Sequence, residues 1–338
     1  MMAHPIDIVY TWCDAADEKW AAKKDAVARA CGLPADSKAN ADCRFAAGED
    51  LKFSLRSAEE CAPWIRRVFL VVDDDAALPA WLDSENPKLR VVRHSEIIPS
   101  RYLPTFDSSC IEHHLAHIPG LSERFLCAND DTMFYRKVEP SFFYAPDGLP
   151  YCRYAGKPRP VDWKPANPYE SRLRRALDLV MSRHPDPGRQ LRSAAVRYPH
   201  HNIDAYLKSD MLATFDLYSG EIEKTLGLHF RTKDTVQRAV YYYEALATGR
   251  GHYRLARRAV GVKRSWIRSL LRPAYAESLQ FVRKRWKTGL DELRQWRPGL
   301  FCFNDTLEIT DEDRAGLVKV YGELFPDKSS FEKQGERA

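Results

Sequence analysis

The stretch FLCANDDTMF, residues 125–134, places Asn129, Asp130 and Asp131 between two apolar runs. A short apolar run that ends in turn-forming residues is typical of a buried strand, so a strand is predicted over residues 125–128. Asparagine and aspartate often do no more than end a strand in a turn. The apolar residues on both sides of this trio favour a functional site over a simple turn.

Two earlier stretches repeat this arrangement. Residues 6–12 (IDIVYTW) form a β-rich run that leads to Asp14, and residues 67–72 (RVFLVV) lead into the aspartates at 73–75. For these three aspartates the turn interpretation is favoured. A further strand is predicted over residues 89–92.

Helical segments lie between these strands. Residues 17–32 begin with an aspartate and end with a glycine, and residues 49–61 carry apolar side chains at helical spacing. Residues 108–117 form a third helical segment, for which Ser108 or Ser109 is the expected cap. Because strands and helices alternate, we predict an α/β fold with a mostly parallel sheet flanked by helices, in which ligands bind beyond the carboxyl ends of the strands.

The chain is predicted to have four parts. Residues 1–160 form the α/β core, and residues 161–300 form a largely helical, basic part that completes the active site. Residues 301–332 form a closing segment that packs back on the core, and residues 333–338 form a tail.

The composition excludes several classes of protein. Hydrophobic residues make up 44% and aromatic residues 12% of the 338 residues, which is enough for a packed core and excludes global disorder. No apolar run exceeds about five residues, against about 20 for a membrane-spanning helix. The N-terminus has neither the basic nor the apolar region of a secretory signal. Eight cysteines without a CxxC pair argue against a zinc ribbon and favour reduced thiols, so a cytoplasmic location is expected.

The charge is unevenly distributed. The chain has a formal net charge of +5, but residues 250–297 carry 14 lysines or arginines and 3 acidic residues, a local charge of +11. Such a stretch fits a nucleic acid, an anionic membrane surface or an acidic substrate, and equally a solvated helical face. Trp266, Trp286 and Trp296 lie in or beside it and are candidates for stacking on sugars, with helix packing as the favoured alternative.

Acidic side chains that gather at strand ends suit Mg²⁺, which binds one or two carboxylates together with phosphate oxygens. The sequence has no glycine-rich phosphate loop. A nucleotide would therefore be held by a metal and side chains, rather than by backbone amides of a glycine loop.

Two histidine groups are further candidates. His113 and His117 lie four residues apart beside Glu112, as in a metal-binding pair. The HExxH order of a zinc protease is missing, so exposed histidines are expected at 113 and 114. His200, in the sequence Pro-His-His after a basic helical segment, is a candidate general base or phosphate ligand, with an exposed loop histidine as the alternative.

Taken in order, these segments resemble the four motifs of the Stealth family of sugar-phosphate transferases. IDIVYTWCDAADEKW resembles the first motif, and the residues from RFAAGEDLKF to FLCANDDTMF resemble the long second motif. RYPHHNIDAYLKSDM with HFRTKDTVQRAVYYYE is similar to the third, and FCFNDTLEIT with LFPDKSSFE is similar to the fourth. The motifs frame residues 6–332, and the second is the most specific.

The family includes bacterial capsule polymerases and the animal enzyme that makes the mannose-6-phosphate lysosomal tag. The resemblance implies a Rossmann-like, glycosyltransferase-A-like core that binds a nucleotide sugar. It implies transfer of a hexose 1-phosphate, commonly N-acetylglucosamine 1-phosphate from its UDP donor, to a hydroxyl of a saccharide or growing polysaccharide. UMP would leave, and Mg²⁺ or Mn²⁺ would be the cofactor. No nucleic-acid partner is expected, and the basic region at 250–297 would guide a polyanionic product or contact the inner face of the cell membrane.

The resemblance also assigns residues, carried over by motif position. The catalytic residues are Glu112, Asp131, His200 and Arg231. The metal ligands are Asp130 and Asp131. The residues that bind the nucleotide sugar and its metal are Tyr10, Thr11, Trp12, Asp14, Arg56, Asn304 and Asp305.

The chain departs from the family pattern at three positions. Ala15 follows Asp14 where a glycine is usual, Asp107 stands in place of an asparagine, and Arg197 replaces the first histidine of the third motif. Glu112 and His200 both stay candidates for the general base. Two other functions stay open at this level, namely a metal-dependent glycosyltransferase that releases UDP and a non-enzymatic binder of anionic polysaccharide.

Overall fold

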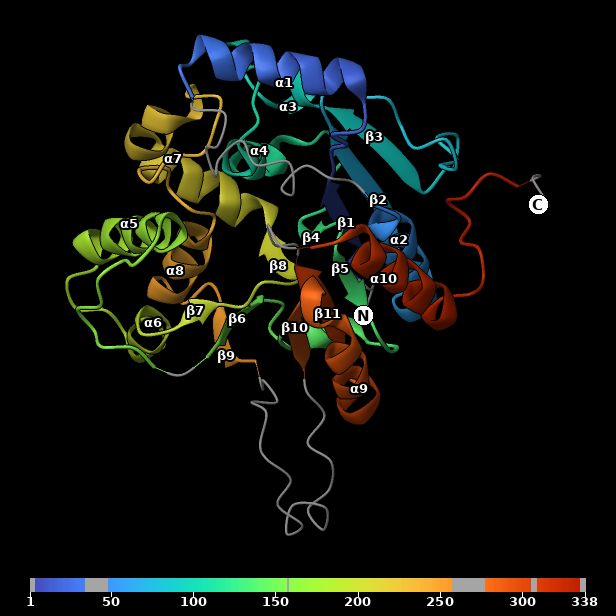
Figure 1. Cartoon of the computed structure of the whole chain (residues 1–338). Helices are drawn as coiled ribbons and strands as arrows, with labels where there is room; N and C mark the ends of the chain where they lie inside the picture. The colour runs from blue at the N-terminus through green and yellow to red at the C-terminus, as the bar shows by residue number, and fades with distance from the viewer. Residues whose placement is uncertain (1–3, 34–47, 157, 257–276, 305–308, 335–338) are drawn as a thin grey trace, which may run out of the picture.

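The computed structural model describes residues 4–33, 48–156, 158–256, 277–304 and 309–334. Its main sheet has the strand order β3-β2-β1-β4-β8 (Figure 1). The first four of these strands run parallel, and β8 pairs antiparallel with β4. The predicted α/β fold with a mostly parallel sheet is confirmed.

The four strands predicted from the sequence correspond to β1, β2, β3 and β4. The described strands are β1 (Ile6–Thr11), β2 (Ile65–Val72), β3 (Leu89–Arg93), β4 (Arg124–Asn129), β5 (Thr132–Phe134), β6 (Tyr151–Ala155), β7 (Tyr198–Pro199), β8 (Asp204–Leu207), β9 (His252–Leu255), β10 (Ser278–Val282) and β11 (Leu300–Asn304).

Helices cover both faces of the main sheet. The described α-helices are α1 (Glu18–Ala30), α2 (Asp50–Cys61), α3 (His94–Ile97), α4 (Ser108–His114), α5 (Pro168–Arg183), α6 (Arg189–Ala195), α7 (Lys208–Leu226), α8 (Ala239–Ala247), α9 (Trp286–Trp296) and α10 (Asp311–Leu324). The short 3₁₀ helices are η2 (Ser100–Tyr102), η3 (Leu115–His117), η4 (Pro140–Phe142) and η6 (Arg283–Arg285). No described helix combines the length and the apolar character that crossing a membrane requires.

The alternation of side chains along β1 divides the core into two layers. Val9 points into a layer formed with α4, α5, α6, α7 and α8. Tyr10, the next residue, points into the opposite layer with α2. Successive strand residues face opposite sides of a sheet, so one strand supplies both layers.

Two smaller sheets extend the core. Strand β11 pairs parallel with β10 and antiparallel with β5, and helices α9 and α10 pack against this second sheet. Strand β6 pairs with β7 and β9 in a third sheet beside α6 and α8. The described part of residues 161–300 contains α5 to α9 and also β7 to β10, which the sequence did not reveal.

The C-terminal segment, which we define as residues 325–334, is held against α2 by Arg56. Arg56 donates Nε and Nη2 hydrogen bonds of 2.7 Å each to the two carboxylate oxygens of Glu332, and Nη1 donates to the carbonyl of Phe325 at 2.9 Å. The segment thereby spans the surface from α10 back to the core.

Two helix caps show how local sequence sets the elements. Asp17 accepts hydrogen bonds from the amides of Lys19 and Trp20 and so begins α1, close to the predicted start. Helix α4 is capped by Asp107, which accepts from the Ser109 amide at 2.8 Å, and not by either serine as predicted.

Candidate active site

The two aspartates of the FLCANDDTMF stretch lie where two sheets meet. Strand β4 ends at Asn129 in the main sheet, and β5 begins at Thr132 in the second sheet, so Asp130 and Asp131 form the turn between them. This turn lies at the carboxyl edge of the main sheet, which we define as the edge at which the parallel strands end. Carboxylates here occupy the usual ligand-binding position of such a sheet.

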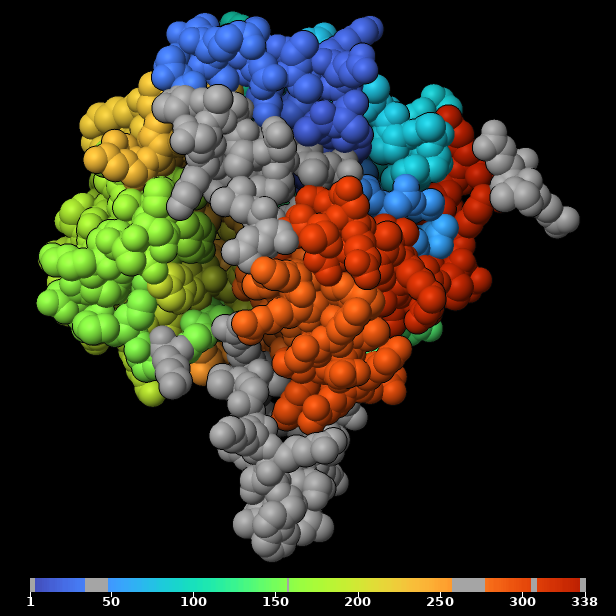
Figure 2. Space-filling view, viewed as in Figure 1, coloured from blue at the N-terminus to red at the C-terminus, as the bar shows by residue number. Residues whose placement is uncertain are grey.

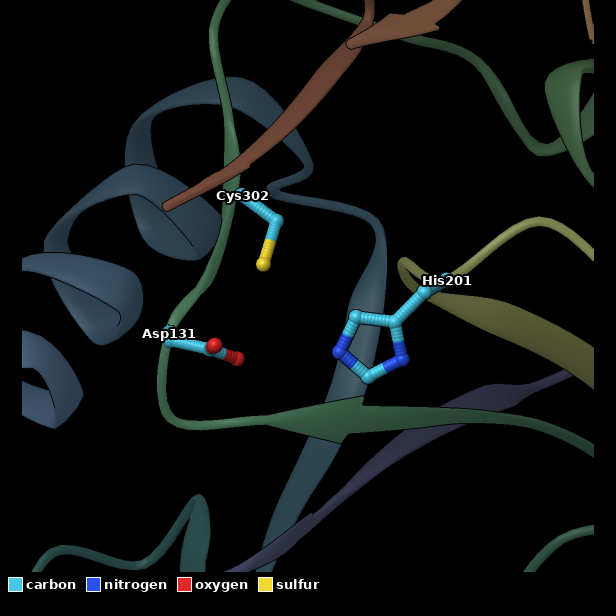
Figure 3. A group of neighbouring side chains, drawn as sticks. All are labelled: Asp131, His201 and Cys302. Atoms are coloured by element: carbon cyan, nitrogen blue, oxygen red, sulfur yellow. The ribbon is translucent and has the colours of Figure 1, made fainter. Parts of the chain in front are cut away.

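Three segments converge on Asp131. Its carboxylate, the imidazole of His201 and the thiol of Cys302 have donor atoms that all lie within 4.8 Å of one another. Figure 3 shows the three side chains pointing toward a shared space. Cys302 reaches it because β11 places this residue opposite Thr132, and His201 reaches it from the connection between β7 and β8.

The charge at this turn is poorly compensated. Burial, the neighbouring Asp131 and then Asp50 raise the pKa of Asp130 well above its ordinary value, and Arg283 only partly offsets them. Oδ1 of Asp131 is buried without a hydrogen-bond partner among the described residues. Closely spaced carboxylates of this kind suit a divalent cation with a preference for oxygen. Asp130 and Asp131 therefore fit the Mg²⁺ or Mn²⁺ expected at this position.

Glu112 is linked to the site through a buried arginine. Arg238, at the start of α8, lies 2.8 Å from Asp204 and 3.4 Å from Glu112, measured between guanidinium nitrogen and carboxylate oxygen. Burial raises the pKa of Asp204, and Arg238 and His201 act in the opposite direction. A row of neighbouring side chains thus connects α4 to the turn after β4. It runs from Glu112 through Arg238, Asp204 and His201 to Asp131.

Arg231 belongs to a second ion pair at the same edge. Its Nε lies 3.5 Å from Oδ1 of Asp107, the N-cap of α4. Burial raises the pKa of Asp107, and Arg231 partly reverses this effect. Burial and then Asp130 and Asp14 raise the pKa of Cys13, while Arg231 lowers it, so this arginine acts on the end of β1 as well.

The residues predicted from the first motif divide into two groups. Thr11 pairs with Asn129 at the carboxyl edge, and Asp14 follows in a turn that its own side chain stabilises through the Ala16 amide. Tyr10, by contrast, is fully buried, and its hydroxyl accepts a hydrogen bond of 3.0 Å from Ser54. Trp12 is also buried in this layer, with 8% of its surface exposed. Tyr10 therefore packs in the core between β1 and α2. The prediction that it contacts the nucleotide sugar does not agree with this position.

The remaining predicted residues differ in their placement. Asn304 lies at the site, because its Oδ1 is 3.2 Å from Sγ of Cys302. Arg56 is engaged with Glu332 in the fastening of the C-terminal segment, so the predicted contact with the donor is replaced by a structural ion pair. His200 is buried with 4% exposed, and its amide donates to the carbonyl of Arg153. Asp305 lies outside the described residues.

The prediction of exposed histidines on α4 is wrong. His113 and His114 are 1% and 2% exposed, and burial lowers the pKa of each to about 4. His113 is hydrogen-bonded to the hydroxyl of Tyr241 and the carbonyl of Val236. These side chains hold α4 in the core and are not available as a metal-binding pair with His117.

Sequence reasoning missed several residues at the site, namely His201, Cys302, Asp204, Arg238 and Asp50. One signal was present in the sequence. Arg238 directly precedes a strongly apolar run, and Asp204 begins another. Buried charges in such runs need partners. Which partners they find depends on pairing between segments far apart in the chain.

Comparison with known proteins identifies two conserved regions in this chain. Residues 44–152 match the family model described as Stealth protein CR2, conserved region 2, and residues 291–338 match Stealth protein CR4, conserved region 4. The chain belongs to the Stealth family. Conserved region 2 contains Glu112, Asp130 and Asp131, and conserved region 4 contains Cys302 and Asn304.

Curated relatives of this Stealth chain carry related names. An exopolysaccharide phosphotransferase of Streptomyces coelicolor is 34% identical over 99% of this chain and 53% of its own length. The chain thus spans about half the length of that relative. The receptor polysaccharide phosphotransferase WefC of Streptococcus oralis is 29% identical, over 97% of this chain and 99% of its own length. Among solved structures, galactosyltransferase LgtC with donor and acceptor sugar analogues matches at 9% identity with a TM-score of 0.42, covering 96% of each chain.

Proposed function

We propose that this Stealth chain is a hexose-1-phosphate transferase of polysaccharide synthesis. It transfers N-acetylglucosamine 1-phosphate from UDP-N-acetylglucosamine to a hydroxyl of a saccharide or growing polysaccharide and releases UMP. The observation that carries the proposal is the carboxylate pair Asp130 and Asp131 at the carboxyl edge of the main sheet, together with conserved regions 2 and 4. The phosphotransferase names of the relatives support the same chemistry.

Phosphoryl transfer chiefly requires positioning and compensation of charge on oxygen. Bound Mg²⁺ or Mn²⁺ would neutralise diphosphate oxygens. Asp130 and Asp131 would hold that ion, and the unsatisfied Oδ1 of Asp131 is the donor atom that supports this assignment. Arg231 would donate planar, paired hydrogen bonds to phosphate oxygens, because Asp107 orients its guanidinium from one side.

The acceptor hydroxyl needs a group that takes its proton. We assign this role to Glu112, whose side chain is 13% exposed and is positioned by Arg238. His200 is 4% exposed, and its backbone amide donates a hydrogen bond to the carbonyl of Arg153. We therefore propose that His200 positions other groups at the site and does not take the proton. The acceptor oxygen would attack the β-phosphorus, and the bond from this phosphorus to the UMP oxygen would break.

The basic region at 250–297 has a smaller part in this proposal than its charge indicates. Arg250 pairs with Asp210, Arg254 contacts Glu277, and Arg283 lies 2.8 Å from Asp50. These arginines are engaged in ion pairs within the chain. The cations between 257 and 276 lie outside the described residues, and contact with a polyanion or a membrane surface through them stays a proposal.

The product nucleotide tests the reaction directly. The protein is incubated with UDP-N-acetylglucosamine, Mg²⁺ and a panel of acceptor sugars, and UMP is separated from UDP by chromatography. Acceptor-dependent UMP is the expected result. Release of UDP would place the attack at the anomeric carbon and would replace the proposal with a metal-dependent glycosyltransferase.

A further inference from the structure

Three side chains with different donor atoms line the shared space beside the turn after β4. Asp131 supplies an oxygen, His201 a nitrogen and Cys302 a sulfur, and these atoms lie within 4.8 Å of one another (Figure 3). An oxygen-preferring ion such as Mg²⁺ gains little from a thiol and an imidazole. Zinc, cobalt and cadmium ions bind all three donor types.

The geometry requires only small side-chain movements. With metal–sulfur and metal–nitrogen distances of about 2.3 and 2.0 Å, donors in a tetrahedral site lie about 3.5 Å apart. The three donors, which lie within 4.8 Å of one another, are therefore at most about 1.3 Å too far apart, a difference that rotation of side chains can supply. Three protein ligands also leave one position open, as in zinc sites that bind water or a substrate group.

The segments that carry these donors are fixed by the fold. Cys302 lies in β11, in register with Thr132 of β5, one residue after Asp131. The segment with His201 is anchored because Nδ2 of Asn202 donates a hydrogen bond of 2.7 Å to Oγ of Ser278 in β10. The thiol of Cys302 in the metal-free chain donates a hydrogen bond of 3.2 Å to Oδ1 of Asn304, which fixes the direction of the side chain. Such supporting contacts are what orients metal ligands.

We propose that Asp131, His201 and Cys302 form a binding site for a thiophilic transition-metal ion, with Zn²⁺ as its physiological candidate. As the metal–sulfur bond forms, the Cys302 thiol gives its proton to solvent. Binding of this ion does not depend on the proposed reaction. Its consequence rests on the proposed function: Zn²⁺ bound here would take Asp131 from the proposed Mg²⁺ ion, so we expect Zn²⁺ to inhibit transfer.

The test is direct metal binding to the full chain without substrate. Metal-free protein is titrated with Co²⁺, and thiolate coordination is read from the near-ultraviolet charge-transfer band. Zn²⁺ affinity is then measured by competition with a chromogenic chelator. We expect the band in the wild type, its loss in Cys302→Ser, and affinity for Zn²⁺ weaker by roughly tenfold or more in Cys302→Ser and His201→Ala.

Matched variants separate this site from other thiols and histidines. Cys31 is an exposed cysteine on a different part of the chain, and His117 is an exposed histidine. Cys31→Ser and His117→Ala should keep the cobalt band and the Zn²⁺ affinity. Unchanged affinity in Cys302→Ser would overturn the proposal.

A measurement on the wild-type chain tests the proposal without any variant that could fold poorly. X-ray absorption at the zinc edge of the one-to-one complex should show one sulfur at about 2.3 Å together with lighter ligands. Lighter ligands alone would overturn the proposal. If zinc binds as expected but UMP is never formed, the metal site stands and the proposed reaction fails.

Discussion

At the scale of single residues, the site is a compromise between stability and binding. Asp130 is buried beside Asp131 and within the field of Asp50, and this environment raises its pKa well above the ordinary 3.8. A buried carboxylate with like-charged neighbours destabilises the folded chain when it ionises. A divalent cation bound at this turn would compensate the charge and so favour the ionised carboxylate.

The variant Asp130→Asn tests this reasoning. Because the folded chain holds the proton more tightly than the unfolded chain, the carboxyl costs stability as pH rises above its unfolded pKa. We expect metal-free Asp130→Asn to exceed the wild type by about 1–2 kcal/mol in free energy of unfolding at neutral pH, and by less in acid. Thermal unfolding with a chelator measures this, and added Mg²⁺ should raise the wild-type Tm only. An equal Mg²⁺ shift in the variant would contradict the assignment.

Arg238 gives a second prediction at this scale. It contacts Asp204 and Glu112 at once, so Arg238→Lys keeps the charge but cannot span both carboxylates with a planar fork. A misplaced Glu112 should lower kcat about 10²-fold and change KM for the donor little. Arg175→Lys, in a surface pair with Glu221, is the matched control. A fall in both variants, or a change confined to KM, would argue against a positioning role.

The sequence reveals some of these residues and not others. The acids after β4 stand out because apolar residues flank them, and Glu112 and Arg231 follow from the motif resemblance. Arg238, Asp204 and Cys302 acquire their roles from contacts across more than 30 residues of sequence, as in the pair between 204 and 238. Pairing at such separation is set by tertiary packing and leaves no periodic signal.

At the scale of elements, α2 and the C-terminal segment depend on each other. Apolar spacing predicted α2 closely, with 49–61 expected and Asp50–Cys61 observed. The same helix carries Asp50, which pairs with Arg283 near the site. It also carries Arg56, which holds Glu332 of the C-terminal segment. The partner of Arg56 lies 276 residues away, which explains why its assignment to the donor site was wrong.

Removal of this fastening should affect stability and spare chemistry. Arg56→Met leaves Glu332 buried without its partner, so we expect a loss of about 3–5 kcal/mol in free energy of unfolding by urea. The double variant with Glu332→Gln should recover part of that loss, as a double-mutant cycle will show. Well below the transition, kcat/KM for the donor should equal that of the wild type. A selective rise in KM would return Arg56 to the donor site.

At the scale of the whole molecule, two kinds of structure differ in how far the sequence predicts them. The parallel strands β1 to β4, of 5–8 residues, each contain a short apolar run and were predicted from the sequence. The second and third sheets consist of strands of 2–5 residues, such as β7, whose pairing joins distant segments. These short sheets nevertheless build the site, because β11 carries Cys302 and the connection that leaves β7 carries His201. Figure 2 shows the helical part in green and yellow beside the orange and red C-terminal part on one face.

The acid sensitivity of the molecule follows from histidines spread through its core. Burial lowers the pKa of His94, His113 and His114 to about 4, against 6.5 when unfolded. As pH falls from 6.5 toward 4, the unfolded chain therefore takes up protons that the folded chain refuses, and stability is lost across that window. Each histidine accounts for up to about 3 kcal/mol.

Thermal unfolding across this window tests the origin of that loss. His113→Gln removes one buried titrating group, so its Tm should fall less steeply with decreasing pH than that of the wild type. His117 lies exposed on the neighbouring η3, and His117→Gln should follow the wild-type slope. Carboxylates titrate alike in all three chains and therefore cancel in the comparison. Parallel slopes for His113→Gln and the wild type would mean that His113 is protonated in the folded chain, which its two hydrogen bonds to Tyr241 and Val236 would then have to accommodate.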